Sequence, residues 1–334
     1  MVVSYCVGVD PHKKFHQVQI QDGYAHTVWE GPVPRTSLGQ ARLIRHLERY
    51  GKPQVHVGVE GSGPFWVRLV KALAAAGIPV SLVNPKRVKH WARSGAGSTR
   101  TDRVDAGIIA DYIRVRRPRL FTVPPPEAER LMDLLKVRHP FMRTRAAWKN
   151  RLGSYRERDA APEGLKEGDL FIQEADAHVD LLTAQIKAQV KGDPVGRALL
   201  QIKGVGPITA AWFLATFPRP EDYPTKAQVK ARVGLVPQEH HSAGKKRSTY
   251  LSREGPPLGR VILHMAACVG SRHNPELKAV YEARQAHGDG KKKARVYVMI
   301  RLLVRMWQIA KRVRREERQH QGPPPGEGEE RKAA

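Results

Sequence analysis

The chain has 334 residues and a formal net charge of +26, because 58 Lys and Arg residues stand against 32 Asp and Glu. This excess is spread along the whole sequence, so it attracts polyanions and favours nucleic acid over a small metabolite as the partner. The two cysteines, Cys6 and Cys268, form no CxxC pair and no Cys/His cluster, which argues against a zinc finger and a disulfide framework.

The sequence carries no membrane or secretion signal. No stretch of about 20 apolar residues occurs, and the beginning, MVVSYCVGVD, lacks a basic region and a long apolar segment. We therefore expect a cytoplasmic protein that works on DNA or RNA and has no membrane partner.

The first 125 residues alternate strand and helix signals. Strands are expected over residues 2–10, 15–23, 24–31, 55–60 and 79–83. Helices are expected from Thr36 to a stop at Gly51, over 64–77, over the basic stretch 86–95, and onward from TRTDRVDA at 99–106. The first helix has an apolar stripe of Leu38, Leu43, Ile44 and Leu47. Three antiparallel strands followed by helix, strand, helix, strand and further helices is the order of an RNase H-like α/β domain.

The strand signals stop after the three prolines at 124–126. A broken heptad predicts a long helix with a coiled-coil seam made of Leu134, Phe141, Trp148, Leu152 and Tyr155. After an expected loop over 159–169, a second amphipathic helix carries Val179, Leu182, Ile186 and Val190. This pair is expected to be a spacer or dimerisation arm, and a plain helical hairpin within one subunit is the alternative.

A second, mainly α-helical domain is expected over residues 193–320. The Pro-, Gly- and Glu-rich segment 321–334 is expected to be disordered.

Four acids of the first domain are candidate metal ligands. Asp10 and Glu60 each end a strand, and in an RNase H-like core these two strands lie side by side. Asp102 and Asp105 are three residues apart, so they project from the same side of a helix. Four converging carboxylates suit Mg²⁺ or Mn²⁺, and two such ions stabilise the attacking and leaving oxygens of phosphodiester transfer.

Each acid also has a local explanation. Asp10 before Pro11 can end a strand, and Glu60 before GSG can be a turn residue. Asp102 is a good helix N-cap, and Asp105 favours the helix dipole. The metal interpretation rests on the four together. Asp111 lies about 240° around the helix from Asp105 and is expected to point elsewhere.

Two stretches of the second domain are candidate DNA contacts. The segment GVGPITA resembles a helix-hairpin-helix, in which Gly204 and Gly206 let backbone N–H groups approach a phosphate next to Lys203. Further on, a polar loop carries the cations Lys245, Lys246 and Arg247 and the serines Ser242, Ser248 and Ser252. The residues alone select no nucleophile among these serines, and a Gly-Pro turn and a solvated loop are the alternatives.

A series of stretches, in order along nearly the whole chain, is similar to one known family. They are GVDPHKK around Asp10, VGVEGSG around Glu60, VNPKRVKHWARSGAGSTRTDRVDAGIIADYI with the two later aspartates, IKGVGPITA, GLVPQEHHSAGKKRSTYLSREG and LGRVILHMAA. The chain resembles the DEDD transposases of circularising insertion sequences, which include bridge-RNA-guided recombinases and the pilin-gene invertase. It departs at Ala243, where the family often has Gly, and at Arg100, where it usually has Lys.

The resemblance implies a division of labour along the chain. Residues 1–125 would be a RuvC-like domain with Asp10, Glu60, Asp102 and Asp105 as metal ligands. Residues 126–192 would be the helical arm, and 193–320 the transposase domain that holds the nucleophilic serine. Ser242 matches the family position of that serine, whereas Ser248 and Ser252 do not.

The resemblance also implies partners. A covalent DNA–serine intermediate would form in a site that pairs the metal domain of one subunit with the serine of another, in a dimer or tetramer. A structured guide RNA would select double-stranded donor and target DNA by base pairing, at the nucleoid of a prokaryotic cell. Ser242 has His240 and His241 nearby but no obvious acid to orient them, so a metal ion is expected to assist the serine.

Three other interpretations stay open. One is a metal-dependent junction nuclease in which water attacks and Ser242 is a loop residue. Another is a non-enzymatic nucleic-acid-binding protein. The last is a sugar-kinase-like or actin-like ATPase, which ranks lowest because the sequence has no later Gly-rich adenine loop.

Overall fold

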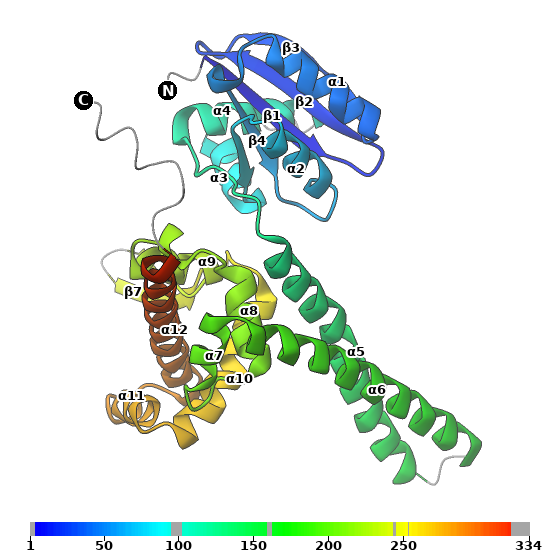
Figure 1. Ribbon diagram of the computed structural model, residues 1–334, viewed down its shortest axis with the longest axis vertical. Helices are drawn as coiled ribbons and strands as arrows, with labels where there is room; N and C mark the ends of the chain where they lie inside the picture. Colours follow the sequence, from blue (N-terminus) through cyan, green and yellow to red (C-terminus); the bar gives the residue numbers. More distant parts are fainter. Residues whose placement is uncertain (1–3, 95–101, 159–161, 243–244, 253, 322–334) are drawn as a thin grey trace. The chain divides into compact units, whose positions relative to one another are not determined.

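The computed structural model describes residues 4–94, 102–158, 162–242, 245–252 and 254–321 (Figure 1). The chain divides into two compact units, Met1–Val123 and Pro124–Ala334. Most of the segment expected to be disordered, residues 322–334, lies outside the described residues.

The first unit is built on a five-stranded mixed sheet. Its strands are β1 (Tyr5–Pro11), β2 (Phe15–Asp22), β3 (Thr27–Pro34), β4 (Val55–Glu60) and β5 (Val80–Val83), in the order β3-β2-β1-β4-β5. The first three strands pair antiparallel, while β4 runs parallel to β1 and β5 runs parallel to β4. The predicted succession of strands and helices in this unit is confirmed.

One strand begins later than expected. The sequence predicts a strand from Tyr24, but β3 starts at Thr27. The carboxylate of Asp22 accepts hydrogen bonds from the backbone N–H groups of Tyr24 and His26, and Ala25 has a φ of 71°. Residues 24–26, which the sequence pattern predicts as the start of the strand, therefore form a turn centred on Asp22.

Four α-helices cover the sheet. They are α1 (Ser37–Glu48), α2 (Val67–Ala75), α3 (Pro85–Ser94) and α4 (Asp102–Arg116), with a short 3-10 turn at Lys52–Gln54. The hydroxyl of Thr36 accepts the N–H of Gly39 and caps α1. The predicted stripe of α1 is correct for Leu43 and Leu47, which are buried, but wrong for Leu38, whose side chain is 58% exposed in the first turn.

The sheet lies between two helical layers. Val7, Val9 and their neighbours pack against the apolar sides of α1 and α2. On the other face, Cys6 packs with residues of α3 and α4, including Val88 and Ile109. This alternation along β1 places Gly8 and Asp10 on the α4 side of the sheet.

Helix α4 lies close against the sheet at two glycines. A Cβ atom added at Gly8 of β1 would lie 1.8 Å from the carbonyl oxygen of Ala106 in α4. A Cβ added at Gly58 of β4 would lie 2.6 Å from the side chain of Ile113. Only glycine at these two positions lets the helix lie this close to the strands.

The chain leaves this unit along the edge of the sheet. The Ser81 hydroxyl of β5 hydrogen-bonds to the carbonyl oxygens of Pro118 and Arg119 at 3.0 and 2.9 Å, and lies 2.8 Å from His56 Nε2. The N–H of Phe121 donates to the carbonyl of Val80 at 2.7 Å. Residues 118–121 are therefore fixed to β5.

The second unit begins with two long helices, α5 (Pro126–Arg156) and α6 (Pro162–Gly192), that pack against each other (Figure 1). The loop expected over 159–169 is too long, because α6 already begins at Pro162. Gly168 makes this possible, since a Cβ there would lie 2.5 Å from the buried Leu152 side chain. The predicted seam holds at Leu152, whereas Tyr155 is 44% exposed.

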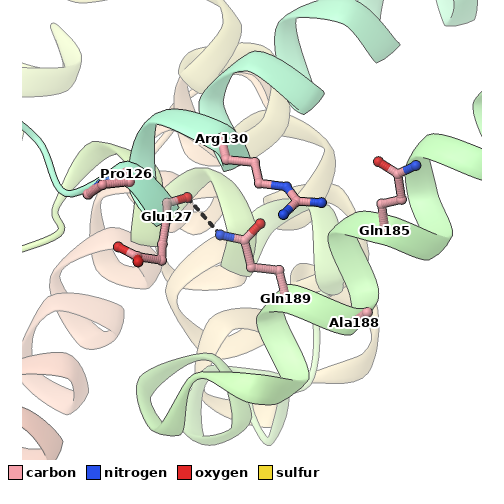
Figure 2. A pocket seen from close by; sticks show the side chains of 6 residues that line it. All are labelled: Pro126, Glu127, Arg130, Gln185, Ala188 and Gln189. Atoms are coloured by element: carbon pink, nitrogen blue, oxygen red, sulfur yellow. Dashed lines mark hydrogen bonds between the residues drawn. The ribbon is translucent and has the colours of Figure 1, made fainter.

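The base of this pair is fixed by a hydrogen bond across the two helices. The side-chain amide of Gln189 donates to the carbonyl oxygen of Glu127 at 2.7 Å (Figure 2). A groove beside this bond is lined by Pro126, Glu127, Arg130, Gln185, Ala188 and Gln189. Its one lining carboxylate, that of Glu127, makes it a poor candidate for a metal site.

The remaining helices form a bundle around one buried helix. They are α7 (Pro194–Leu200), α8 (Pro207–Thr216), α9 (Lys226–Val233), α10 (Pro257–His273), α11 (Pro275–Ala286) and α12 (Lys291–Gln321), with a 3-10 turn at Pro220–Asp222. Buried residues lie all around α8, including Trp212 and Phe213, as expected of a helix at the centre of a core. No helix within the described ranges is long and apolar enough to cross a membrane.

A hairpin replaces the polar loop expected near Ser242. Strands β6 (Pro237–Ser242) and β7 (Lys245–Leu251) pair antiparallel, with Ser242 opposite Lys245 and a register shift at His240/His241. The expectation of a loop was wrong because these strands lack the apolar alternation that marks a half-buried strand.

The pH dependence of stability should reflect His16 of β2. This side chain is fully buried, and neither ring nitrogen has a hydrogen-bond partner. Burial, and then the charges of Arg35 and His12, lower the pKa of His16 from 6.5 to about 4. The unfolded chain therefore binds a proton here at a higher pH than the folded chain. Stability should be complete above pH 6.5 and fall toward pH 4, by up to about 1.4 kcal/mol per pH unit.

Replacing His16→Leu should flatten this loss. Urea unfolding of fluorotryptophan-labelled protein can be followed by fluorine NMR, in which Trp29, Trp66 and Trp91 report on the first unit. Some pH dependence should remain, because burial also lowers the pKa values of His46 and His56. An unchanged slope in the variant would show that His16 does not titrate as its burial requires.

Candidate active site

Asp10 and Glu60 lie at neighbouring strand ends. In the parallel pair of β1 and β4, Val9 is opposite Val59, so the acids that follow them are adjacent. Both are half-buried, and the Asp10 side chain is 14% exposed. The predicted placement of these two acids at one edge of the sheet is confirmed.

Asp105 reaches the same edge from α4. It precedes Ala106, whose carbonyl lies against Gly8, and Gly8 is two residues before Asp10 in β1. The close helix–sheet contact thus carries the half-buried Asp105 to the strand ends. Asp102 is the first residue of α4, and its side chain lies outside the described ones.

The pKa of Glu60 reports how these acids interact. Burial raises it, and the negative charges of Asp10 and then Asp105 raise it further. A hydrogen bond from the Ser62 side chain and the charge of His12 act in the opposite direction. Three carboxylates therefore share one partly buried region in which a proton or a cation is favoured.

Sequence reasoning missed two neighbours of Asp10. His12 Nε2 lies 3.1 Å from Asp10 Oδ2, and Gln17 of β2 is directly opposite Asp10 in the antiparallel pair. The signal for His12 was its position two residues beyond a strand-terminal acid. Gln17 could be found only from the register of β1 and β2.

Asp111 is separate from this group. Trp91 Nε1 donates to Asp111 Oδ2 at 2.8 Å, and Arg114 pairs with the other carboxylate oxygen. As expected from its helical position, its carboxylate is held between α3 and α4 by these two partners.

The donor chemistry of the acids fits a hard cation. Among the described side chains, no three His, Cys, Asp or Glu residues are already arranged to hold a metal ion. The side chain of Asp102 is not one of the described side chains. Carboxylate oxygens are nevertheless the ligands that Mg²⁺ and Mn²⁺ prefer. Burial first, and then the charges of Asp10 and Asp105, raise the pKa of Glu60, and a divalent cation would neutralise these negative charges.

Ser242 and the loop cations belong to the second unit. Ser242 ends β6 opposite Lys245, Lys246 is opposite His241, and Arg247 falls at the register shift. Their backbone positions thus gather along one hairpin; their side chains lie outside the described ones.

The predicted helix-hairpin-helix corresponds to α7, the turn at 201–206 and α8. Gly204 has a φ of 104°, and a Cβ there would lie 2.7 Å from the Cα of Gly270 in α10. Packing therefore accounts for Gly204. Gly206 is the N-cap of α8, is exposed and has open space around it, and Lys203 is exposed two residues before Val205. The start of α8 at Gly206 is thus open and lies near a cation, although the first helical residue, Pro207, has no N–H.

Two family models match the chain. A model described as a transposase, of the DEDD IS110 type, matches residues 7–155, and a model described as the transposase IS116/IS110/IS902 family matches residues 196–282. The first match spans Asp10, Glu60, Asp102 and Asp105, and the second spans α8 and the β6–β7 hairpin. The chain belongs to the IS110 family of transposases.

Curated relatives agree with this assignment. A probable family 20 transposase of Pseudomonas aeruginosa is 28% identical over 77% of this chain and 81% of its own length. A putative transposase of Sinorhizobium fredii is 25% identical, over 78% of this chain and 71% of its own. The pilin gene-inverting protein of Moraxella bovis is 22% identical, over 84% of this chain and 88% of its own.

Among solved structures, T. thermophilus RuvC in complex with a Holliday junction substrate aligns with 35% of the transposase and 99% of that chain, at 15% identity and a TM-score of 0.28.

The transposase is thus an enzyme of DNA transposition with an acidic centre in its first unit. Nucleases with such a carboxylate set generally use divalent metal ions, which stabilise the charge that develops on the reacting oxygens. Asp10, Glu60 and Asp105 are the described side chains that could hold them.

Replacing Glu60→Gln should uncouple the transposase from divalent cations. In metal-free buffer the variant should melt no lower than the parent, because a repelling charge has been removed. Saturating Mn²⁺ should raise the melting temperature of the parent, by the equivalent of about 2.7 kcal/mol at 100 times the Kd, and that of the variant much less. Differential scanning calorimetry measures both.

Glu48→Gln is the matched control for this experiment. Glu48 pairs with Lys52 at the end of α1, away from the strand-end acids, so this variant should respond to Mn²⁺ like the parent. Equal Mn²⁺ shifts in the parent and in the Glu60 variant would contradict the metal assignment.

Proposed function

We propose that this transposase cuts and rejoins DNA through metal-assisted attack of Ser242 on a phosphodiester. Asp10, Glu60, Asp102 and Asp105 would hold two Mg²⁺ or Mn²⁺ ions. The observation that carries this proposal is the convergence of Asp10, Glu60 and Asp105 in one partly buried region where the pKa of Glu60 is raised.

The division of the chain follows from the same proposal. Residues 1–125 would form an RNase H-like, RuvC-like metal domain, in keeping with the strand order β3-β2-β1-β4-β5. Residues 126–192 would be the arm through which a dimer or tetramer assembles. Residues 193–320 would bring the serine.

The proposed reaction consists of two successive transfers of the DNA phosphoryl group, first to Ser242 and then to another DNA end. The Ser242 hydroxyl loses its proton and its oxygen bonds to phosphorus, while the bond from phosphorus to a deoxyribose oxygen breaks and that oxygen takes up a proton. A hydroxyl of another DNA end then loses its proton and its oxygen bonds to phosphorus, while the bond from phosphorus to the serine oxygen breaks and that oxygen takes up a proton. Bound divalent ions would lower the barrier by stabilising negative charge on the phosphate and on both exchanging oxygens.

Ser242 is supported by its position in the hairpin. It ends β6 opposite Lys245, and Lys246 and Arg247 follow on β7, so the backbone places cations beside the proposed nucleophile. Such cations suit binding of the DNA phosphates of donor and target duplexes. Lys203 and Gly206 would contact further phosphates at the turn before α8, in which Gly204 lies against α10.

Substituting Ser242→Ala should abolish the covalent protein–DNA adduct and strand exchange while leaving DNA binding intact. Labelled DNA that carries the ends of the insertion sequence would be incubated with Mg²⁺, and the adduct would be measured on a denaturing gel. Ser248→Ala is the matched control, because Ser248 lies opposite His240 in the same hairpin and should keep full activity.

The outcome separates the proposal from a junction nuclease. If water were the nucleophile, the parent would cut DNA without an adduct and Ser242→Ala would cut equally well. Recombination by the Ser242 variant would refute the serine assignment.

A structured guide RNA is proposed as the source of target choice. The net charge of +26 attracts polyanions, and RNA is a second polyanion that would neutralise part of it. Base pairing by this RNA would select the donor and target duplexes.

Sequencing of RNA that co-purifies with the transposase tests the guide. We expect one discrete, structured species encoded beside the gene, and its removal should abolish strand exchange. Recovery of only fragments of abundant cellular RNA would contradict a guide and leave the serine chemistry untouched.

A further inference from the structure

The edge of the sheet that carries Asp10 and Glu60, termed here the acidic edge, is flanked by lysines on both sides. Strands β1, β4 and β5 run parallel and end at this edge, and β2 begins there because it runs antiparallel to β1. Lys13 and Lys14 lie in the β1–β2 turn on one side. Lys86 and Lys89 lie in α3, which follows β5, on the other.

The first pair of lysines stands on a fixed turn. The N–H of His12 donates to the carbonyl of Phe15 at 2.9 Å, which closes the turn across Lys13 and Lys14. The carbonyl of Lys14 also accepts the N–H of Arg35 at 3.1 Å, just after β3. Both lysine side chains are exposed. Their backbone is thus held three and four residues beyond Asp10.

The second pair stands on a helix anchored beside Glu60. Glu60 is opposite Val83 of β5, and the Asn84 side chain accepts the N–H of Lys86 at 2.9 Å at the start of α3. Val88 is buried against α4, while Lys86 and Lys89, three residues apart, are exposed. Arg93 continues this exposed side away from the sheet.

Within the described part of the chain, the ammonium groups of these four lysines are not neutralised by an acidic side chain. None has an ion-pair partner within it, and α3 contains no acid. By contrast, Lys52, at the opposite end of the sheet, pairs with Glu48 at 3.1 Å. Unpaired cations next to a group of acids attract a ligand that is itself negatively charged and extended.

The spacing suits one strand of nucleic acid. From β2 to β5 the acidic edge crosses three strand intervals of about 4.8 Å each. The resulting distance of about 14 Å is the rise of about four nucleotides, at about 3.4 Å for each phosphate of one strand. A DNA strand that crosses the ends of these β-strands would therefore place one phosphate over the acids and neighbouring phosphates over the lysines on both sides.

We propose that Lys13 and Lys14 on one side, and Lys86 and Lys89 on the other, bind the phosphates of a single DNA strand on either side of the reacting phosphodiester. The lysines are positioning residues. They offset the repulsion between the DNA and the acids, and they align the DNA strand across the acidic edge. This inference rests on the proposed function only in taking the phosphodiester over the acids as the reacting one.

Lysine acetylation read by mass spectrometry tests the contact directly. RNA-free transposase would be acetylated in EDTA, with and without a random-sequence single-stranded DNA oligonucleotide, so that no cleavage occurs. DNA should protect Lys13, Lys14, Lys86 and Lys89 several-fold and leave Lys52 unprotected. Equal acetylation of the four lysines with and without DNA overturns the proposal. Protection of these lysines by RNA and not by DNA overturns it as well.

The salt dependence of DNA binding gives a second measurement. The double variant Lys13→Gln/Lys14→Gln, and likewise Lys86→Gln/Lys89→Gln, should lower the slope of log affinity against log salt by about 1.4, at about 0.7 for each phosphate contact. The control Arg49→Gln/Lys52→Gln removes two exposed charges at the opposite end of the sheet and should keep the parental slope. Parental slopes in both lysine pairs would overturn the proposal.

Failure of this inference and failure of the proposed function look different. Mn²⁺-dependent stabilisation should persist in both double lysine variants. Its persistence would show that these variants fold and keep the acids in place. Loss of the serine adduct alone would leave the acetylation pattern unchanged. Unprotected lysines beside an intact adduct would refute only the strand path.

Discussion

The site in the first unit depends on the contact of α4 with the sheet at Gly8 and Gly58. The helix backbone touches β1 at Gly8, since a Cβ there would lie 1.8 Å from Ala106 O, and the Ile113 side chain of α4 touches β4 at Gly58. This contact fixes the height and rotation of α4, and so the position of Asp105 one residue earlier. The parallel pairing of β1 and β4 supplies the other two acids. The transposase thus gathers three carboxylates from elements far apart in sequence through strand pairing and the close packing of α4 on the sheet.

Charge is distributed around this contact with opposite signs. The centre holds Asp10, Glu60 and Asp105, and the pKa of Glu60 is raised by burial and then by the charges of the other two acids. Exposed lysines of the β1–β2 turn and α3 surround it, within a chain whose net charge is +26. Acids alone would repel DNA, and lysines alone would bind it without chemistry. In the proposed function, the lysines would draw the polyanion in and the acids would hold the divalent cations.

Much of the first unit could be predicted from sequence, because its strands and helices have clear periodicity. The strand ends at Asp10 and Glu60, and the start of α4 at Asp102, follow from that pattern and from topology. The partners of those acids could not be predicted: His12 and Gln17 meet Asp10 through strand register, which no local pattern encodes. In the second unit, polar strands β6 and β7 and the early start of α6 escaped notice, since polar pairing and a glycine that accommodates Leu152 leave no apolar signal. The roles of Ser242 and of the metal ligands stay predictions.

The anchoring of residues 118–121 has a mechanical consequence. Ser81 and the Val80 carbonyl hold this segment against β5 by hydrogen bonds. Tension applied to the chain beyond Val123 is therefore transmitted to the last strand of the sheet and not to α4. Helix α4, which carries Asp105, is thereby separated from the following chain by a segment fixed to β5, so that a displacement of the chain beyond Val123 meets the edge strand of the sheet before it meets α4.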